Sequence, residues 1–338
     1  MKKLSLSLQT LSCMMIVAYT YAAEEHGQWM VGVCSEKSMK KTQQDRYTFQ
    51  PFEHNGEQGL LAAVFDGHGR DEDGHKVAEM VNNKFCNYFK ERLQNSNDIK
   101  KALQGAYEDC HELVFASHTK LYIPQHTDTS YANVIEFRIN KNANNGYSSI
   151  GSTGIASVIY NDKVAIANLG DSRAYIKIND KFFATRDHKP NDPEEQEYYN
   201  LCEQNVAFKR QFGTNIFRTI REKNRIEYCD NSVNISRCFG DYEYKLNAEK
   251  TEKLEMMAVR EEADITKHEV SENSYIILAS DGFWDVVTNE EVDTLVQTIS
   301  ADTNSEEEIA KRLTTYAVKE KGSEDNTTVI FIRYKKQS

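Results

Sequence analysis

The sequence predicts an α+β fold in which antiparallel sheets are covered by pairs of long helices. Two observations carry this prediction. Short apolar runs rich in β-branched and aromatic residues recur along the chain, and some follow one another through tight turns. Long segments of helical periodicity stand between groups of these runs. Strands joined by tight turns pair antiparallel, and helices grouped apart from them cover the outer faces of the sheets.

Six apolar runs are predicted to be strands, because Gly, Asn or Asp bounds them. Only the turn sequence Gly-Asp-Ser separates 164–169 from 173–178, which favours an antiparallel hairpin. The predicted strands are 60–65, 155–160, 164–169, 173–178, 274–280 and 327–334.

Four segments are predicted to be helices. In residues 97–116 the apolar positions fall on one stripe of 3.6-residue period, and residues 75–93 have a similar pattern. Two further helices begin at Thr288 and Ser305, each of which stands three residues before a glutamate, as in a capping box.

Residues 1–22 are typical of a secretory signal peptide. Two lysines precede a short apolar stretch, and cleavage after Ala22 or Ala23 would fit. Ser, Gln and Thr interrupt that stretch, which makes it a poor membrane-spanning helix. We therefore expect export through the secretory pathway to the periplasm or the extracellular space, with no stable membrane insertion after cleavage.

The rest of the chain, residues 28–336, is predicted to form one large domain, because no internal repeat or Pro/Gly-rich linker divides it. Two stretches are predicted insertions, the Asn-rich 121–147 and the polar, helix-biased 193–228. A net charge of −11 without a long basic run argues against nucleic acid or an anionic membrane as the main partner.

Six cysteines would remain after cleavage, and their pairing stays open. An even number in an exported protein permits disulfides, but the density is low and there is no CxxC pair. Cys86 and Cys110 fall on the apolar faces of predicted helices, as buried thiols do. The six are Cys34, Cys86, Cys110, Cys202, Cys229 and Cys238.

Three aspartates stand at the ends of predicted strands and are candidate metal ligands. Asp66 and Asp281 each follow an apolar run and precede a glycine, and Asp325 precedes an asparagine at the start of a strand. Gly and Asn make chain reversals unstrained there, so the three strand ends can meet at one sheet edge. Carboxylates without nearby thiolates suit Mg²⁺ or Mn²⁺ better than zinc. A turn explains any one of them alone, and 73–74 is predicted to be such a turn.

Seven short motifs occur in order along nearly the whole chain. They are VFDGHG (64–69), GSTG (151–154), NLGDSRAYI (168–176), RDHKP (186–190), SRCFGDYEYK (236–245), ASDGFWDVV (279–287) and SEDNTTVIFI (323–332). In this order they resemble the metal-dependent serine/threonine protein phosphatases, the type 2C family, from about Asp45 to Ile332. The resemblance implies a four-layer αββα sandwich of two antiparallel sheets, with a metal site at one edge.

The resemblance further implies hydrolysis of phosphoserine and phosphothreonine in proteins. Two divalent ions, Mg²⁺ or Mn²⁺, would hold a hydroxide that attacks phosphorus directly, without a phosphoenzyme. By similarity, Asp66 bridges both ions and the Gly67 carbonyl binds one of them. Asp281 and Asp325 complete the site.

The resemblance also assigns residues around the ions. Asp45 matches an acid that hydrogen-bonds metal-bound water. His68 lies two residues from Asp66, from where it would protonate the departing alkoxide as general acid; a hydrogen-bonded structural histidine is the alternative.

A third, weaker ion or the outer shell is the expected place of Asp171, Asp285 and Thr153. Turn chemistry explains Asp171 equally well, and small-residue packing explains Thr153. Asp241 matches a family motif without an assigned role.

The chain departs from the family pattern where phosphate would bind. Five residues before Asp45 the family has an arginine, and this chain has Lys40, with Lys41 beside it. Gln44 replaces an acid that normally adjoins Asp45. The segment 193–228 also differs. It is either a basic-aromatic flap that contacts substrate, through Lys209, Arg210, Phe217 and Arg218, or an amphipathic surface helix.

Two other functions stay open. One is a catalytically silent relative that keeps the fold as a binding module, and the other is a secreted phosphatase for small phosphate esters. The presence of Asp66, Asp281 and Asp325 favours turnover over the silent module. We expect a monomer whose partner is a phosphoprotein.

Replacing Lys40 by arginine is expected to lower KM for a phosphorylated substrate. Lysine binds phosphate as a point charge, whereas arginine offers two parallel donors. Steady-state kinetics of Lys40→Arg against the unsubstituted enzyme test this, and an unchanged or higher KM would argue against it.

Overall fold

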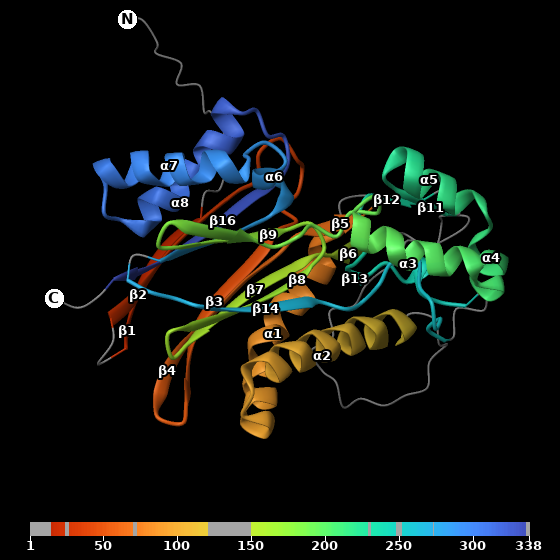
Figure 1. The fold of residues 1–338 in the computed structure, drawn as a ribbon, viewed down its shortest axis with the longest axis horizontal. Helices are drawn as coiled ribbons and strands as arrows, with labels where there is room; N and C mark the ends of the chain where they lie inside the picture. Colours follow the sequence, from red (N-terminus) through yellow and green to blue (C-terminus); the bar gives the residue numbers. More distant parts are fainter. Residues whose placement is uncertain are drawn as a thin grey trace, which may run out of the picture.

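Two antiparallel sheets packed face to face form the centre of the structure, and helices cover both outer faces (Figure 1). The structure is a computed structural model that describes residues 15–23, 27–69, 73–120, 150–228, 231–247, 252–272 and 274–335. Within these ranges the layers run helices, sheet, sheet, helices, which confirms the predicted αββα sandwich.

Eleven described strands build the two large sheets, and every neighbouring pair is antiparallel. The first sheet has the order β1 (Met15–Ala23), β2 (Gly27–Glu36), β16 (Thr327–Lys335), β15 (Tyr275–Ala279), β9 (Arg173–Ile178) and β10 (Lys181–Ala184). The second has the order β14 (Asp264–Glu269), β8 (Lys163–Leu169), β7 (Gly154–Tyr160), β4 (Glu57–Phe65) and β3 (Arg46–His54).

Two helix groups cover these sheets (Figure 1). On the second sheet lie α1 (His75–Ser96) and α2 (Ile99–Lys120). On the first lie α6 (Asp281–Trp284), α7 (Asn289–Asp302) and α8 (Glu306–Thr315), followed by one π-helical turn at Tyr316–Glu320.

Smaller elements lie beside the sandwich. A three-stranded sheet has the order β13 (Phe239–Gly240), β6 (Ile150–Ser152) and β5 (Gly67–Gly69), and a 3₁₀ turn at Tyr242–Tyr244 follows β13. The segment 193–228 folds into α3 (Pro193–Gln204), α4 (Val206–Phe212), α5 (Asn215–Lys223) and β11 (Ile226–Tyr228), which pairs with β12 (Asn231–Val233).

The apolar run in β4 shows how the layers share one strand. Leu60, Ala62 and Val64 pack into the core between the two sheets. The alternate residues Leu61, Ala63 and Phe65 pack against α1 and α2. Because both faces of the strand are covered, its sequence is continuously apolar rather than alternating.

Every predicted strand and helix is present, although β15 and α2 begin one or two residues later than predicted. The strands are β4, β7, β8, β9, β15 and β16, and the helices are α1, α2, α7 and α8. At α7 both halves of the capping box form between Thr288 and Glu291. At α8 the Ser305 hydroxyl accepts a hydrogen bond from the backbone N–H of Glu308.

Several other predictions concern residues that lie partly outside the described ranges. Cys34, Cys86, Cys110, Cys202 and Cys238 are free and buried, and Cys229 lies outside these residues. The predicted insertion 121–147 lies outside them too, as do residues 1–14 of the predicted signal peptide. The remainder of that peptide, from Met15, contributes to β1. None of the described helices combines the length and apolar content that a membrane crossing requires.

A buried ion network fastens α3 to the sandwich. The Glu195 carboxylate is fully buried and accepts hydrogen bonds from Ser236, Arg237 and Arg260, at 2.7 Å from the Ser236 Oγ and 2.7 Å from the Arg260 Nη2. Burial alone would raise the pKa of Glu195, but the arginines lower it to about 2. The network holds the helical segment against the strand-end region that carries Arg237.

Replacing Glu195 by glutamine is expected to reduce the free energy of unfolding by about 3 kcal/mol or more, because the buried Arg237 and the partly buried Arg260 lose a charged partner, although Arg237 keeps Asp264. The folded-state pKa of about 2 lies below the ordinary glutamate value. The stabilisation is therefore complete above the pKa of the unfolded chain and disappears as the pH falls toward 2. Urea unfolding measured at several pH values tests both points.

The neighbouring Glu194 provides the control, because its side chain is 69% exposed and pairs with Arg186 at the surface. Glu194→Gln should change the unfolding free energy by less than about 0.5 kcal/mol. Equal losses in the two variants would contradict the role given to Glu195.

Candidate metal centre

Three aspartates from the two sheets approach one another at one end of the sandwich. Asp66 directly follows β4 of the second sheet. Asp281 begins α6 two residues after β15, and Asp325 stands two residues before β16, both in the first sheet. The charge of Asp281 acts on Asp66, and the charge of Asp325 acts on Asp281. The structure thus brings together the side chains that the sequence singled out at strand ends.

The carboxylates of this end repel one another. Burial raises the pKa of Asp66 well above its ordinary value, and the charges of Asp281 and Asp45 raise it further. Burial also raises the pKa of Asp281, with added contributions from Asp171 and Asp285. Groups of like charge held this close are stable in their ionised forms only beside cations.

Asp45 supplies a buried carboxylate oxygen that has no hydrogen-bond partner in the described protein. The side chain is 3% exposed, and its Oδ2 accepts a 2.8 Å hydrogen bond from the Ser280 hydroxyl. Its Oδ1 is buried without a partner. Burial raises the pKa of Asp45 to about 6, although hydrogen bonds from Thr328 and Ser280 oppose the rise. An unsatisfied buried acceptor is costly, which favours a donor or a cation beside it.

The glycines after Asp66 and Asp281 are required by close packing rather than by an unusual backbone angle. A Cβ on Gly67 would stand 2.4 Å from the carbonyl oxygen of Gly74, and one on Gly282 would stand 2.1 Å from the Asn326 carbonyl oxygen. Neither glycine has a positive φ. The turn freedom expected from the sequence is therefore not what these positions use. A side chain at either position would clash with backbone directly beside the aspartates.

These residues fit hard divalent ions. The donors are carboxylate and carbonyl oxygens, which Mg²⁺ and Mn²⁺ prefer. Among the residues that the structure describes, no three of these carboxylates place one oxygen each within 4.8 Å of one another. The arrangement is therefore wider than a cage that closes around one ion.

Lys189 is a cation at this end that the sequence analysis did not select. It forms an ion pair with Asp171, which is buried. Burial would lower the pKa of Lys189, but Asp171 raises it, and Asp281 and Asp285 add to the rise. Asp285 is exposed at the end of α6. The motif RDHKP, which contains Lys189, was the available signal.

Thr153 holds the backbone beside Asp66. Its N–H donates to the Asp66 carbonyl oxygen at 2.8 Å, and its Oγ1 accepts from the Asp66 N–H at 3.2 Å. The same Oγ1 lies 2.7 Å from the Ser172 hydroxyl. Thr153 therefore fixes the strand end that presents Asp66, which is the outer-shell alternative of the sequence analysis.

His68 has a buried carboxylate partner, Asp241. The His68 Nε2 lies 2.8 Å from the Asp241 Oδ2, and Asp241 is only 1% exposed. Burial would lower the pKa of His68, but the charge and hydrogen bond of Asp241 raise it, which favours the imidazolium. The sequence analysis left Asp241 without a role. Asp241 follows Gly240 and has a φ of 52°. This left-handed backbone conformation is the local feature that directs the Asp241 side chain toward the His68 ring.

Lys40 lies at the rim of the carboxylates. Its Nζ is 2.9 Å from the Asp325 Oδ2, and its side chain is 38% exposed. Burial would lower the pKa of Lys40, but Asp325, Asp281 and Asp66 raise it. A charged, half-exposed ammonium therefore stands beside the carboxylates.

The segment 193–228 presents basic side chains but not the aromatic one proposed beside them. Phe217 is 2% exposed and packs in the segment's own core, which favours the amphipathic surface helix of the two alternatives. Arg210 and Arg218 are exposed. The helices bury their aromatic face inward, as an amphipathic surface segment does.

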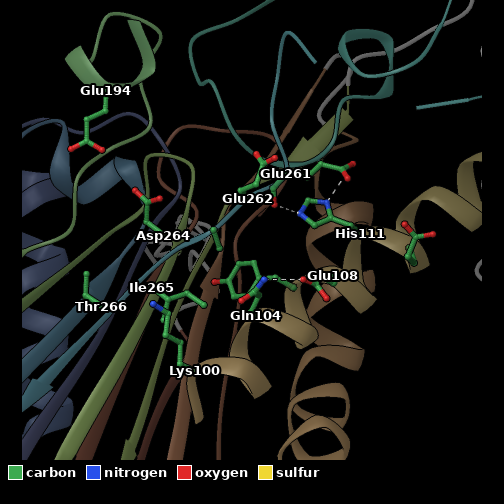
Figure 2. A pocket seen from close by; sticks show the side chains of 13 residues that line it. Lys100, Gln104, Glu108, His111, Glu194, Glu261, Glu262, Asp264, Ile265 and Thr266 are labelled. Atoms are coloured by element: carbon green, nitrogen blue, oxygen red, sulfur yellow. Dashed lines mark hydrogen bonds and ion pairs between the residues drawn. The ribbon is translucent and has the colours of Figure 1, made fainter. Parts of the chain in front are cut away.

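A cavity of about 660 Å³ lies apart from the carboxylates, between α2 and the chain that leads into β14 (Figure 2). Gln104, Glu108, His111 and Glu261 are among its lining residues, and none of the strand-end aspartates lines it. Burial lowers the pKa of His111 to about 3, so this histidine is neutral. Because the strand-end aspartates lie outside this cavity, its volume says nothing about the chemistry that they can perform.

Comparisons with known proteins agree with this arrangement. A family model described as Protein phosphatase 2C matches residues 29–327. "Probable protein phosphatase 2C 59" of Oryza sativa subsp. japonica is 30% identical over 316 residues, which cover 92% of this chain and 78% of that protein. "Probable protein phosphatase 2C 69" of Arabidopsis thaliana is 28% identical, over 92% of this chain and 71% of that protein.

Solved structures show the same fold. Serine-threonine phosphatase 2C from Toxoplasma gondii has a TM-score of 0.61 at 18% identity, over 95% of this chain and 99% of that one. The catalytic domain of serine threonine protein phosphatase PstP, solved with two manganese ions, has a TM-score of 0.53 at 15% identity, over 91% and 98%. The family match spans most of the chain. This protein therefore belongs to the protein phosphatase 2C family and is a metal-dependent serine/threonine protein phosphatase, in a family that uses Mg²⁺ or Mn²⁺.

Proposed function

We propose that this phosphatase hydrolyses phosphoserine and phosphothreonine in exported or extracellular phosphoproteins, with two divalent ions held by Asp66, the Gly67 carbonyl, Asp281 and Asp325. The observation that carries the proposal is the approach of carboxylates from both sheets at one end, where burial and mutual repulsion raise the pKa values of Asp66 and Asp281. Two such ions would supply an activated water for direct attack on phosphorus and neutralise the phosphoryl oxygens.

The chain's own residues then orient the attacking water and donate a proton to the leaving group. The free Oδ1 of Asp45 accepts a hydrogen bond from the attacking water and orients it. His68 donates a proton to the departing serine or threonine oxygen, because Asp241 favours its charged form. Asp241 does not touch the substrate and acts as a positioning residue for the imidazole.

Lys40 is proposed to bind a phosphoryl oxygen. The ion pair with Asp325 already holds the ammonium at the rim of the site, and its partial exposure leaves donors available to a substrate. A single ammonium gives one charged contact without the fixed fork of an arginine.

Two ions account for the expected ligands without a third. Asp171 already has a protein cation, Lys189, and the charge of Lys189 also reaches Asp285. A third ion near these two aspartates would have to compete with that ammonium. We therefore propose two ions, with Asp171 and Asp285 in the outer shell.

Export from the cytoplasm and a monomeric state are further parts of this proposal. The support for export is the composition of residues 1–22, and cleavage after Ala22 or Ala23 would remove all or nearly all of β1. Export would place the substrate outside the cytoplasm that makes the enzyme. We propose that the mature protein acts as a monomer.

Replacing Asp281 by alanine is expected to reduce Mn²⁺-dependent hydrolysis of a phosphothreonine peptide by at least about 100-fold, because one ion loses its ligand. Chelation by EDTA should abolish the activity, and added Mn²⁺ should restore it. Asp73→Ala is the matched control and should change the rate less than twofold, since the exposed Asp73 side chain pairs with Lys76 at the start of α1.

The same assay separates the alternatives. A preference for p-nitrophenyl phosphate over phosphopeptides would indicate a phosphatase for small esters. Absence of turnover with any Mn²⁺ or Mg²⁺ concentration would indicate a silent binding module and contradict the proposal.

Replacing Asp241 by asparagine is expected to lower kcat by about 10- to 100-fold, with KM little changed, because His68 loses the charge that keeps it protonated and oriented. Asparagine tolerates the positive φ of this position, so the backbone should persist. The double variant His68→Gln/Asp241→Asn should be no slower than His68→Gln alone. Additive losses in the double variant would show that Asp241 acts elsewhere.

A further inference from the structure

A second constellation of metal-ligand atoms lies beside the aspartates and differs from them in chemistry. His68 Nε2, Cys238 Sγ and Asp241 Oδ2 all lie within 4.8 Å of one another. Asp241 Oδ2 is 2.8 Å from the imidazole nitrogen and 3.2 Å from the sulfur. Among the residues that the structure describes, this is the only group of three side chains that meets this condition.

The small sheet fixes the three atoms before any ion arrives. His68 in β5 pairs with Gly151 in β6, and β6 pairs on its other side with β13, which precedes Asp241. A Cβ on Gly151 would stand 2.6 Å from the His68 Nε2, so the glycine leaves the space that the ring occupies. Cys238 lies directly before β13 and is fully buried.

The donor set suits a borderline-soft cation. Nitrogen, sulfur and carboxylate oxygen together are typical ligands of zinc, and the thiolate disfavours Mg²⁺ and Mn²⁺. Zinc–ligand distances of about 2.0–2.3 Å in a tetrahedron place neighbouring donor atoms roughly 3.3–3.7 Å apart. The two distances to Asp241 Oδ2, 2.8 and 3.2 Å, are slightly shorter than that range, so these side chains would have to move apart by less than an ångström to admit the ion.

The surroundings offer both charge balance and access. Asp241 and a Cys238 thiolate would supply two negative charges to one divalent ion. The Lys245 ammonium donates to the Cys238 carbonyl oxygen at 2.6 Å. Burial and the charge of Asp241 raise the pKa of the Cys238 thiol well above its ordinary value, and Lys245 opposes that rise only in part, so the thiolate depends on the charge of a bound cation. The His68 side chain is 26% exposed, which opens the site to solvent and leaves a position for water as fourth ligand.

We propose that His68, Cys238 and Asp241 form an inhibitory site for zinc. Binding releases the Cys238 thiol proton to solvent, and the His68 Nε2 binds through its lone pair, with its proton lost to solvent. No atom changes its oxidation state. The bound imidazole can no longer donate a proton to a leaving group, so occupation stops hydrolysis. This inhibitory half rests on the proposed role of His68, whereas the metal site itself does not.

The test compares zinc inhibition of the Mn²⁺-loaded enzyme with that of Cys238→Ala and Cys238→Ser. Each rate is normalised to the zinc-free rate of the same variant. Both variants are expected to need at least tenfold more zinc for half-inhibition than the unsubstituted enzyme. Cys110→Ala, which removes a buried thiol from the core under α1 and α2, should keep the original sensitivity.

A second readout does not depend on turnover. Cd²⁺ is added to the Mn²⁺-loaded protein as a probe, and the ultraviolet charge-transfer band of a metal thiolate is recorded. The band should appear in the unsubstituted protein and in Cys110→Ala, and it should be lost in both Cys238 variants.

Equal zinc sensitivity of the Cys238 variants and the unsubstituted enzyme would overturn the inhibitory site, as would a band that persists without Cys238. A band without inhibition would overturn the role in regulation. An enzyme that is inactive with Mn²⁺ from the outset would contradict the proposed function, and the Cd²⁺ band would still decide the metal site.

Discussion

Repulsion among carboxylates at one end of the sandwich is the constraint on which the rest of the structure depends. Asp66, Asp281 and Asp45 are brought near one another by strands of two different sheets, and burial increases the free energy cost of ionising each of them. The aliphatic core between the sheets and the helices on both outer faces supply the stability that holds these groups in place. Lys40 and Lys189 neutralise only part of the charge. The remaining charge is what makes the site a receptor for divalent ions.

Backbone contacts keep the acids at a fixed spacing without any help from an ion. The Asn326 Oδ1 accepts a 2.8 Å hydrogen bond from the Gln44 N–H, and the Asn326 Nδ2 donates to the Lys37 carbonyl oxygen at 2.8 Å. Ser280 ties the Thr328 N–H to Asp45. The residue that replaces a family acid, Gln44, thus still serves as a backbone anchor. Preformed sites of this kind bind with little loss of conformational entropy.

The sequence was sufficient to predict a strand or helix where local sequence rules and burial favour the same structure. The central strands β4 and β15 are continuously apolar because both of their faces are covered, and the start of α7 carries its own cap. Edge strands were harder to predict: all four residues of β10 are exposed and no residue of β14 is buried, so burial imposes no regular apolar pattern on either strand.

At the site, single aspartates at strand ends could be selected from the sequence, although the same short sequence fits a turn as well as a metal ligand. Their partners were not predictable, since pairs such as Asp241 with His68 and Lys189 with Asp171 depend on long-range pairing of strands. The glycines beside the aspartates were identified from sequence, but for a reason that the packing does not support.

The Glu195 network links two regions that the chain keeps far apart. Ser236 and Arg237, which bind Glu195, lie only a few residues before Asp241, the partner of His68. The position of α3 and the position of the partner of the imidazole are therefore coupled through one short stretch of backbone, 236–241.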